Sequence, residues 1–341
     1  MNDELLQLIR KDFGTEIAFR VNEPGRVANV TMLPTGIASL DNALGGGVAQ
    51  GRIIEIYGEE SSGKSAMACA IVGSLQRQGY SGLYVDVEYA LNLMEAEKNG
   101  VDLDDLVVSQ PETAEVAMKL IETVVRRSPK KMVIVLDSVA SLLTKRELEG
   151  DPGDANIGLT ARLMSQMMRK LAGATSTGDH VLIFINQMRM KIGVLFGDPR
   201  TTTGGNSLKF YASQRISMGK RQKLGPKEDP IGQLCKFRVE KNKVAPPFKT
   251  GSFTIWYNEV GIDYVADTLD NAALLGVVRK VGGRFYYPTD SEQFLGGVNG
   301  REKVIEYLRE QPLLYSDIYH DTVVAMSPPE IEETTAEPPS D

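Results

Sequence analysis

The sequence predicts an α/β protein whose core is a mostly parallel β-sheet covered by helices on both faces. From residue 52 onward, short continuous apolar runs alternate with segments whose apolar residues recur at helical spacing. The apolar runs are not interrupted by polar residues at every second position, so both faces of the sheet are expected to be buried. A glycine-rich turn joins the first of these strands to the first helix, as in sheets that bind nucleotides.

The elements of this core follow in a regular order. A short helix over Glu4–Asp12 comes first, and the residues up to 50 form an extended connector because Pro and Gly interrupt them. The core then alternates strand and helix over Arg52–Tyr57, Lys64–Gln78, Gly82–Val87, Thr113–Arg127, Met132–Asp137, Leu159–Ala172 and Val181–Ile185.

After Gly205 the pattern changes to strands separated by turn residues. This predicts an antiparallel extension of the sheet, with strands at Gln214–Met218, Cys235–Glu240 and Ser252–Tyr257. A small α/β module follows, with elements at Asp267–Leu275, Val277–Val281, Arg284–Tyr287 and Arg301–Glu310. We therefore divide the chain into an N-terminal arm (1–30), the core (31–262), a C-terminal α/β domain (263–326) and an acidic disordered tail (327–341).

Composition excludes several classes of protein. The 341 residues contain no apolar run of 18 or more, so no membrane-spanning helix is expected, and the acidic N-terminus does not look like a secretory signal. Cys69 and Cys235 cannot form a disulfide framework and fit a reducing, cytoplasmic compartment. His180 and His320 are too few and too far apart to favour a zinc site or a histidine-based triad.

The distribution of charge is more informative than its sum of −7. The last fifteen residues hold five acids and no bases. In contrast, residues 186–223 hold eight bases and one acid, Asp198. This local excess of positive charge in an acidic protein predicts a polyanionic partner.

The strongest motif lies between the first core strand and helix and matches G-x-x-x-x-G-K-[ST]; it comprises Gly58, Glu59, Glu60, Ser61, Ser62, Gly63, Lys64 and Ser65. The glycines let backbone N–H groups converge on phosphate oxygens, and the helix beginning at Lys64 adds its positive end. In such loops the lysine reaches the β- and γ-phosphates and the hydroxyl residue ligates Mg²⁺.

Three polar residues end neighbouring strands. Asp137 is expected beside the phosphate loop, as a partner of Mg²⁺ through water or as a helix N-cap. Glu88 is a candidate for polarising the attacking water or a solvated strand-end acid, with Asp86 as its rival on the same side of the strand. Gln187 is a candidate sensor of the γ-phosphate or a polar strand cap.

A long glycine-rich loop follows Gln187 and alternates cations with flexible apolar groups. Cations attract phosphates, apolar side chains can stack on bases, and hydroxyl and amide groups add phosphate contacts. The composition favours nucleic acid over an oligomer contact, through Met188, Arg189, Met190, Lys191, Ile192, Gly193, Phe196, Arg200, Thr201, Thr202, Thr203, Gly204, Gly205 and Asn206. A second, acidic loop at Glu147–Gly158 precedes a helix that carries Arg162.

Together these motifs resemble the bacterial RecA recombinase family over residues 30–310, and most closely over 36–255. The resemblance is carried by Gly51–Ser65, Met164–Gly173, Leu182–Gly193, Thr201–Ser213 and Lys241–Phe248. It implies the RecA-like P-loop core, with ATP and Mg²⁺ as cofactors. It also implies that the N-terminal helix is a polymerisation arm, that the C-terminal module gathers duplex DNA, and that the tail is regulatory.

The resemblance also assigns roles to single residues. Glu88 matches the water-activating glutamate, Asp137 the Mg²⁺-associated aspartate, and Gln187 the glutamine that couples γ-phosphate to DNA. Both loops, with Arg162, match DNA-binding loops. Four further matches concern contacts between subunits: Lys241 and Lys243 touch ATP across the interface, and Lys209 and Phe210 are interface residues.

Several positions depart from the family. Glu95 stands where a tyrosine stacks on adenine, Asn92 where an aspartate contacts it, and Arg200 where an acid is common. These departures suggest a divergent, phage- or plasmid-encoded member and leave the choice of nucleoside triphosphate open.

The sequence therefore predicts a cytoplasmic, DNA-dependent ATPase of recombination, DNA repair and the SOS response. It is expected to form helical filaments on single-stranded DNA and to pair that strand with a homologous duplex. Further partners implied by the family are a single-strand-binding protein or a self-cleaving repressor. The rival functions are a ring-shaped helicase, an ATP-gated DNA-binding scaffold with negligible hydrolysis, and a small-molecule kinase.

Overall fold

We describe the computed structural model of the chain over residues 2–14, 17–20, 30–151, 158–190, 200–258 and 260–326. The chain separates into two compact units, residues 1–31 and residues 32–341. In the first unit, helix α1 spans Asn2–Phe13 and contains the helix predicted at Glu4–Asp12. The predicted acidic tail, residues 327–341, lies outside the described residues.

The second unit is built on an eleven-stranded sheet whose middle is parallel, as the sequence predicts. Its long path runs β13-β12-β11-β9-β3-β7-β6-β4-β5, and each neighbouring pair from β9 to β5 is parallel. These six strands are β3 (Ile53–Gly58), β4 (Ser81–Asp86), β5 (Leu106–Ser109), β6 (Met132–Asp137), β7 (Val181–Met190) and β9 (Gln214–Met218).

The remaining strands extend this sheet in the antiparallel sense, as predicted for Cys235–Glu240 and Ser252–Tyr257. They are β11 (Gly232–Asn242), β12 (Thr250–Trp256) and β13 (Gly261–Ile262), with β10 (Gln222–Leu224) paired to β11 and β8 (Arg200–Thr202) paired to β7. The prediction is wrong for Gln214–Met218, because this strand, β9, pairs in parallel with β3 and is antiparallel only to β11. A separate two-stranded ribbon joins β1 (Met32–Leu33) to β2 (Val48–Ala49).

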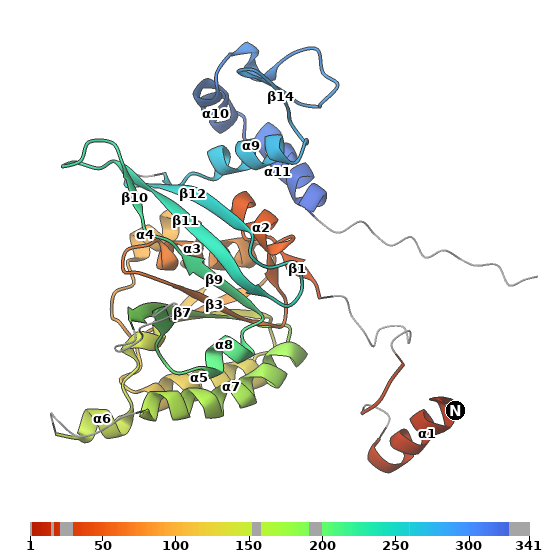
Figure 1. The fold of residues 1–341 in the computed structure, drawn as a ribbon, viewed down its shortest axis with the longest axis vertical. Helices are drawn as coiled ribbons and strands as arrows, with labels where there is room; N and C mark the ends of the chain where they lie inside the picture. The colour runs from red at the N-terminus through yellow and green to blue at the C-terminus, as the bar shows by residue number, and fades with distance from the viewer. Residues whose placement is uncertain are drawn as a thin grey trace, which may run out of the picture. The chain divides into compact units, whose positions relative to one another are not determined.

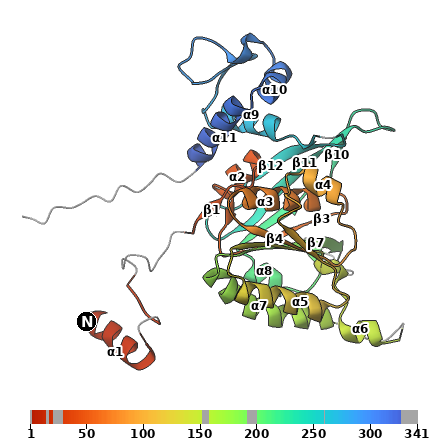
Figure 2. The ribbon, with the colours of Figure 1, turned by 180° about the vertical axis from the view of Figure 1, so that it is seen from behind.

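Helices cover both faces of the sheet (Figures 1 and 2). One face carries α2 (Ala38–Leu44), α3 (Lys64–Arg77) and α4 (Leu93–Lys98), and the other carries α5 (Ala114–Arg127), α7 (Leu159–Thr177) and α8 (Ser207–Tyr211). Two short helices, η1 (Val139–Ser141) and α6 (Lys145–Glu149), follow β6. The central parallel strands β3, β4, β6 and β7 are therefore buried on both sides, whereas the edge strand β5 is partly exposed.

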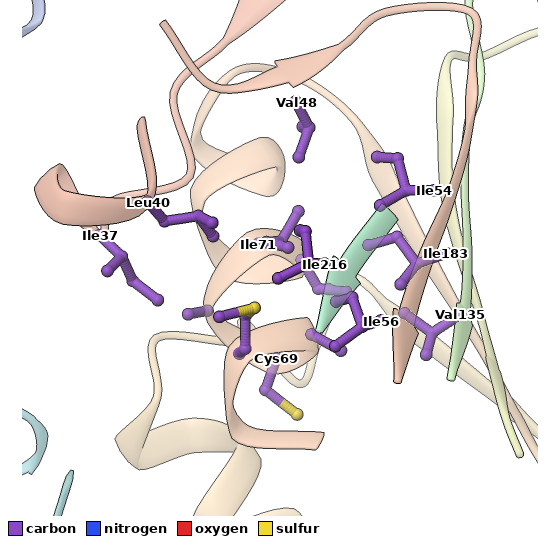
Figure 3. Close-up of a cluster of buried hydrophobic side chains, with 14 of the residues drawn as sticks. Ile37, Leu40, Val48, Ile54, Ile56, Cys69, Ile71, Val135, Ile183 and Ile216 are labelled. Carbon is purple, nitrogen blue, oxygen red and sulfur yellow. The ribbon is translucent and has the colours of Figure 1, made fainter. Parts of the chain in front are cut away.

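Alternate residues of each strand enter two separate apolar clusters, as the pleat requires. Ile54 and Ile56 of β3 join the cluster beneath α2 and α3, whereas Ile53 joins the cluster beneath α5 and α7. Figure 3 shows the first cluster, where Ile71 of α3 packs over Ile56 and Ile183 of the sheet. This double burial explains why the strands have continuous apolar sequences.

The C-terminal part has its own apolar cluster, within residues 266–318. It is formed by α9 (Tyr264–Leu274), β14 (Arg279–Val281), β15 (Arg284–Tyr286), η2 (Leu295–Gly297), α10 (Arg301–Arg309) and α11 (Pro312–Met326). Helices α9 and α11 both pack against α2. The joint also contains a hydrogen bond from the Ser39 amide to Asp267, 2.9 Å long.

Several element boundaries differ from those predicted. Helix α7 continues five residues beyond Ala172, because Thr175 is buried and its hydroxyl bonds within the helix. Strand β7 continues to Met190 because β8 pairs with its end. Helix α9 begins at Tyr264, since the Asp263 side chain caps it. The sequence did not predict α11, which starts at Pro312, a residue suited to the first turn of a helix.

No helix in the described part of the chain is both long and apolar enough to cross a bilayer.

Candidate nucleotide and DNA site

The phosphate loop connects β3 to α3 and needs glycine at both of its ends. Gly63 has φ of 93°, in the left-handed region, and a side chain there would lie 2.8 Å from the sulfur of Cys235. At Gly58 a side chain would lie 2.7 Å from the carbonyl oxygen of Met218. These two glycines let the backbone of the loop turn tightly. The first amides of α3 therefore lie beside a cavity at the start of that helix.

The side chain of Lys64 folds back over this loop. Its Nζ donates to the backbone oxygen of Glu59 at 2.7 Å, and the residue is only 9% exposed. Burial lowers the pKa of Lys64, while the carboxylates of Asp137 and Glu88 oppose that shift. An ammonium group with few water partners is ready to exchange a carbonyl for phosphate oxygens.

Asp137 lies at the end of β6, next to the start of α3. Its Oδ2 accepts hydrogen bonds from the hydroxyl of Ser65 at 2.8 Å and from the hydroxyl of Tyr84 at 2.7 Å. Burial raises the pKa of Asp137, and these two hydrogen bonds oppose the shift. The alternative as a helix cap does not hold, because Ser138 is the N-cap residue of η1.

Glu88 lies just beyond the end of β4 and meets Gln187, which lies within β7 and not at its end as predicted. One carboxylate oxygen of Glu88, Oε1, accepts hydrogen bonds from Ser138, from Ser141 at 2.8 Å and from the Gln187 amide at 3.3 Å. Asp86 is turned elsewhere and is 1% exposed, accepting from the amides of Ala90 and Leu91 and from Gln110. The two acids therefore do not share a side, contrary to the prediction.

A cavity of about 490 Å³ opens beside these groups, a size typical of small-ligand sites. It is lined by the phosphate loop, Glu88 and Asp137, together with residues from α4 and from the antiparallel extension. Asn92 and Glu95 come from α4 and its N-cap, and Arg221 and Tyr257 come from the antiparallel extension. Asn92 caps α4 by accepting from the Glu95 amide, and Glu95 pairs with Lys98 at 3.0 Å.

The oxygen groups present fit Mg²⁺ held together with a nucleotide. Ser65 and Asp137 offer one hydroxyl and one carboxylate, and Mg²⁺ typically takes one or two such protein groups and completes its shell with phosphates and water. Within the described ranges, no cluster of three or more His, Cys, Asp or Glu residues could hold a metal by itself. The phosphate oxygens of a nucleotide would have to supply the rest.

Of the residues assigned to DNA, those of the long loop are described only at its two stems, and Arg162 lies on α7. Arg189 and Arg162 are exposed, and Met188 is half-buried. A side chain at Gly204 would lie 2.7 Å from Val139, so the second stem passes close to η1. Outside the described residues lie Lys191, Ile192, Gly193 and Phe196 and much of the acidic loop; the side chains of Met190 and Arg200 are likewise undescribed.

The four residues assigned to subunit contacts lie together on a neighbouring surface. Lys241 donates from Nζ to the backbone oxygens of Lys209 at 2.7 Å and Phe210 at 2.9 Å, and Lys243 donates to the latter at 3.4 Å. Burial, then the positive charges of Lys243 and Arg215, lower the pKa of Lys241 to about 8. The Phe210 side chain is 69% exposed.

Four residues of the site were missed in the sequence. Tyr84 could have been found, because an aromatic residue two positions before Asp86 in a doubly buried strand must find a partner for its hydroxyl. Ser138 follows a strand-end acid. Arg221 and Tyr257 carry no local signal, since they reach the cavity only through the pairing of β10, β11 and β12.

Comparison with known proteins agrees with this geometry. The family model for the RecA N-terminal domain matches residues 2–263. Protein RecA of Geobacter sulfurreducens is 49% identical over 314 residues, covering 92% of this chain and 91% of that relative. Protein RecA of Syntrophus aciditrophicus is 46% identical, covering 91% and 89%. A crystal structure of the RadB recombinase superposes with a TM-score of 0.51 at 23% identity, covering 68% and 98%, which supports the fold.

Proposed function

Since this chain belongs to the RecA family and is an ATP-dependent recombinase, we propose that the cavity at the carboxyl edge of its sheet binds ATP with Mg²⁺. The phosphate loop and Lys64 hold the phosphates, while Ser65 and Asp137 hold the metal, the latter through water. Bound Mg²⁺ neutralises charge on the phosphates. The support for this assignment is the contact between Ser65 and Asp137.

We further propose that Glu88 activates the attacking water. Its Oε1 already accepts three hydrogen bonds, which fixes the carboxylate in one orientation. Among the described residues nothing donates to Oε2, so this oxygen can accept from a water molecule. Gln187 then senses the γ-phosphate by exchanging its contact with Glu88 for one with phosphate.

The chain binds DNA and forms filaments as members of this family do, and we propose that the two loops bind single-stranded DNA and pair it with a homologous duplex. Lys241 and Lys243, beside Lys209 and Phe210, act on ATP held by the neighbouring subunit. The N-terminal helix serves as the polymerisation arm, and the C-terminal module, residues 263–326, gathers duplex DNA. The cytoplasm is the proposed site of action.

The single observation that carries this function is the 3.3 Å hydrogen bond between Gln187 and Glu88. It joins Gln187, the residue that the long glycine-rich loop follows, to Glu88 in the nucleotide cavity. A change at the γ-phosphate can therefore reach the loop through one side chain, which is the coupling that a DNA-dependent ATPase requires.

The test is ATP hydrolysis with and without single-stranded DNA, with electron microscopy of the same samples. We expect strong stimulation and helical filaments that need nucleotide. Directional unwinding without pairing would favour the ring-shaped helicase, and filaments with negligible hydrolysis would favour the scaffold.

Lys64→Ala serves as the control for nucleotide binding in this test. Loss of a charged hydrogen-bond donor should weaken ATP binding by about 10- to 100-fold. If Lys64→Ala bound ATP and DNA as tightly as the unaltered protein does, the proposed site would be wrong.

The nucleotide base and further partners are also open to test. Asn92 and Glu95 line the cavity, so competition among ATP, GTP, CTP and UTP would establish base selection. A single-strand-binding protein and a self-cleaving repressor are the further partners we propose.

A further inference from the structure

A buried polar cluster crosses the middle of the sheet, outside the nucleotide cavity. It joins Glu55 of β3, Asn186 of β7 and Arg215 of β9, three adjacent strands. Glu55 and Asn186 are 0% exposed. The Nε of Arg215 donates to Glu55 Oε2 at 2.5 Å, and the Asn186 amide donates to Glu55 Oε1 at 3.0 Å.

Such a cluster is not explained by stability. Removing a carboxylate and a guanidinium from water costs free energy that their attraction repays only in part, and well-packed apolar residues would often serve as well. The three side chains are nevertheless held in one arrangement, with Arg215 also stacked over Tyr57, 4.6 Å from its ring centre. The arrangement therefore points to a role in positioning.

Asn186 is the centre of this cluster and uses all of its hydrogen-bonding capacity. Its amide nitrogen donates to Glu55 and to the backbone oxygen of Thr203 at 3.1 Å. Its Oδ1 accepts from the backbone N–H of Gln187 at 2.9 Å and from the Thr203 hydroxyl. One side chain thus holds both ends of the long loop, at Gln187 and at Thr203.

The same cluster is continuous with the proposed subunit surface. Arg215 lies opposite Lys241 in the pairing of β9 with β11. Lys241 donates to the backbone of Lys209, whose own Nζ donates to the Thr201 hydroxyl at 3.0 Å. A second set of contacts therefore reaches the end of the loop from the surface that meets the neighbouring subunit.

We propose that Glu55, Asn186 and Arg215 are positioning residues that clamp the two stems of the DNA loop and orient Gln187 toward Glu88. The clamp fixes the position of the loop stems relative to the nucleotide cavity. DNA binding at the loop therefore alters the cavity, and nucleotide binding in the cavity alters the loop. This inference rests on the proposed function, because it assumes that the loop binds DNA.

The cleanest test is Thr203→Val, which removes one hydroxyl at constant shape. Two quantities are measured: hydrolysis against single-stranded DNA concentration, and hydrogen exchange, without DNA, of the amides in residues 187–190 and 200–203. The second is decisive, because the loss of a direct contact between Thr203 and DNA would not change it. We expect the DNA concentration for half-maximal stimulation to rise about 3- to 10-fold and those amides to exchange faster. Affinity for a fluorescent ATP analogue without DNA should not change.

Thr175→Val is the control, because it removes the same group from a threonine whose hydroxyl donates to the Leu171 backbone oxygen within α7, at 2.7 Å. It should leave stimulation and loop exchange as they are. Asn186→Ala, which breaks both stems, should exceed Thr203→Val in both measurements.

Unchanged loop exchange and unchanged DNA dependence in Thr203→Val would overturn the clamp. So would a loss of ATP-analogue affinity without DNA that is as large as the rise in the DNA concentration for half-maximal stimulation. The two proposals fail separately. If the unaltered chain showed no stimulation by DNA, the proposed function would fall, whereas loop exchange would still report on the clamp.

Discussion

Two parts of the molecule bury acidic side chains, but only one of them supplies positive charge. In the catalytic half, by which we mean the sheet and the nucleotide cavity at its edge, Glu55 is paired with Arg215. Asp137 in the same half lies near Lys64 and accepts hydrogen bonds from two hydroxyl groups. At the joint between α2 and α9, Asp41 and Asp267 receive hydrogen bonds from neutral groups only, among the described residues.

Burial raises the pKa of both Asp41 and Asp267 to about 7. Thr35 donates its amide and hydroxyl to Asp41 at 2.8 Å and 2.6 Å, yet the other carboxylate oxygen is buried and finds no hydrogen-bond partner in the described part of the chain. The comparison shows that burial alone does not decide whether an acid is charged. A nearby cation opposes the rise in pKa that burial causes, and where the described residues offer no cation, neutral hydrogen-bond donors alone oppose that rise.

The largest effect is expected from Glu88→Gln, which removes a charge from the catalytic half at constant shape. Loss of a general base typically slows the reaction about 10²- to 10⁴-fold, while ATP and DNA should still bind. Steady-state hydrolysis and filter binding measure the two properties. Asp41→Asn makes the same chemical change at the joint and should hydrolyse normally; normal turnover in Glu88→Gln would remove Glu88 from its role.

Arg215→Met should come next, because it leaves Glu55 buried without its cation. Breaking a buried pair on one side typically costs about 3–5 kcal/mol of unfolding free energy, which urea denaturation would measure. Adding Glu55→Gln should recover most of that loss. If Arg215→Met alone were as stable as the parent, the cation would not be what allows Glu55 to be buried.

The third prediction concerns pH and sharpens the difference between the two regions. Asp41 and Asp267 keep their protons in the folded state while the unfolded chain releases them near pH 4. Stability should therefore fall as pH rises from about 4 to about 7, by about 1.4 kcal/mol per pH unit for each group. Above pH 7 the folded groups ionise too, and the loss levels off.

Urea denaturation between pH 4 and pH 8 would test this dependence. Asp41→Asn should flatten the curve and be more stable than the parent at pH 8. A parent that gained stability over the same interval would show that these carboxylates are charged in the folded state.

The smallest effect is expected from Tyr84→Phe, which removes one donor from Asp137. The carboxylate should lose part of its orientation, at a cost of about 1 kcal/mol, so that half-saturation of nucleotide binding requires several-fold more Mg²⁺. Titration of a fluorescent ATP analogue with Mg²⁺ measures this. Tyr80→Phe is the control, because its hydroxyl is buried without a partner; an unshifted Mg²⁺ midpoint in Tyr84→Phe would exclude the role.

Much of the nucleotide site could be predicted because its residues belong to local sequence patterns. The phosphate loop is contiguous, and Asp137 and Gln187 each follow a continuous apolar run, so parallel pairing had to bring them to one edge. The division between Glu88 and Asp86 could not be predicted. Just past the end of β4 the backbone turns, and the choice depends on contacts with Ser138, Ser141 and Gln110, far along the chain.

The order of apolar runs and the spacing of the phosphate loop determined the sheet, its helical layers and the chemistry at its edge, since these follow from local periodicity and from groups adjacent in sequence. Tertiary structure alone decided which buried acids lie beside a cation and which side chain ties the loop stems together. Asn186 meets Glu55 and Thr203, and Asp41 meets no cation among the described residues, only because strands and helices distant in sequence lie side by side. Electrostatic energy depends on those distances in space, and sequence does not contain them.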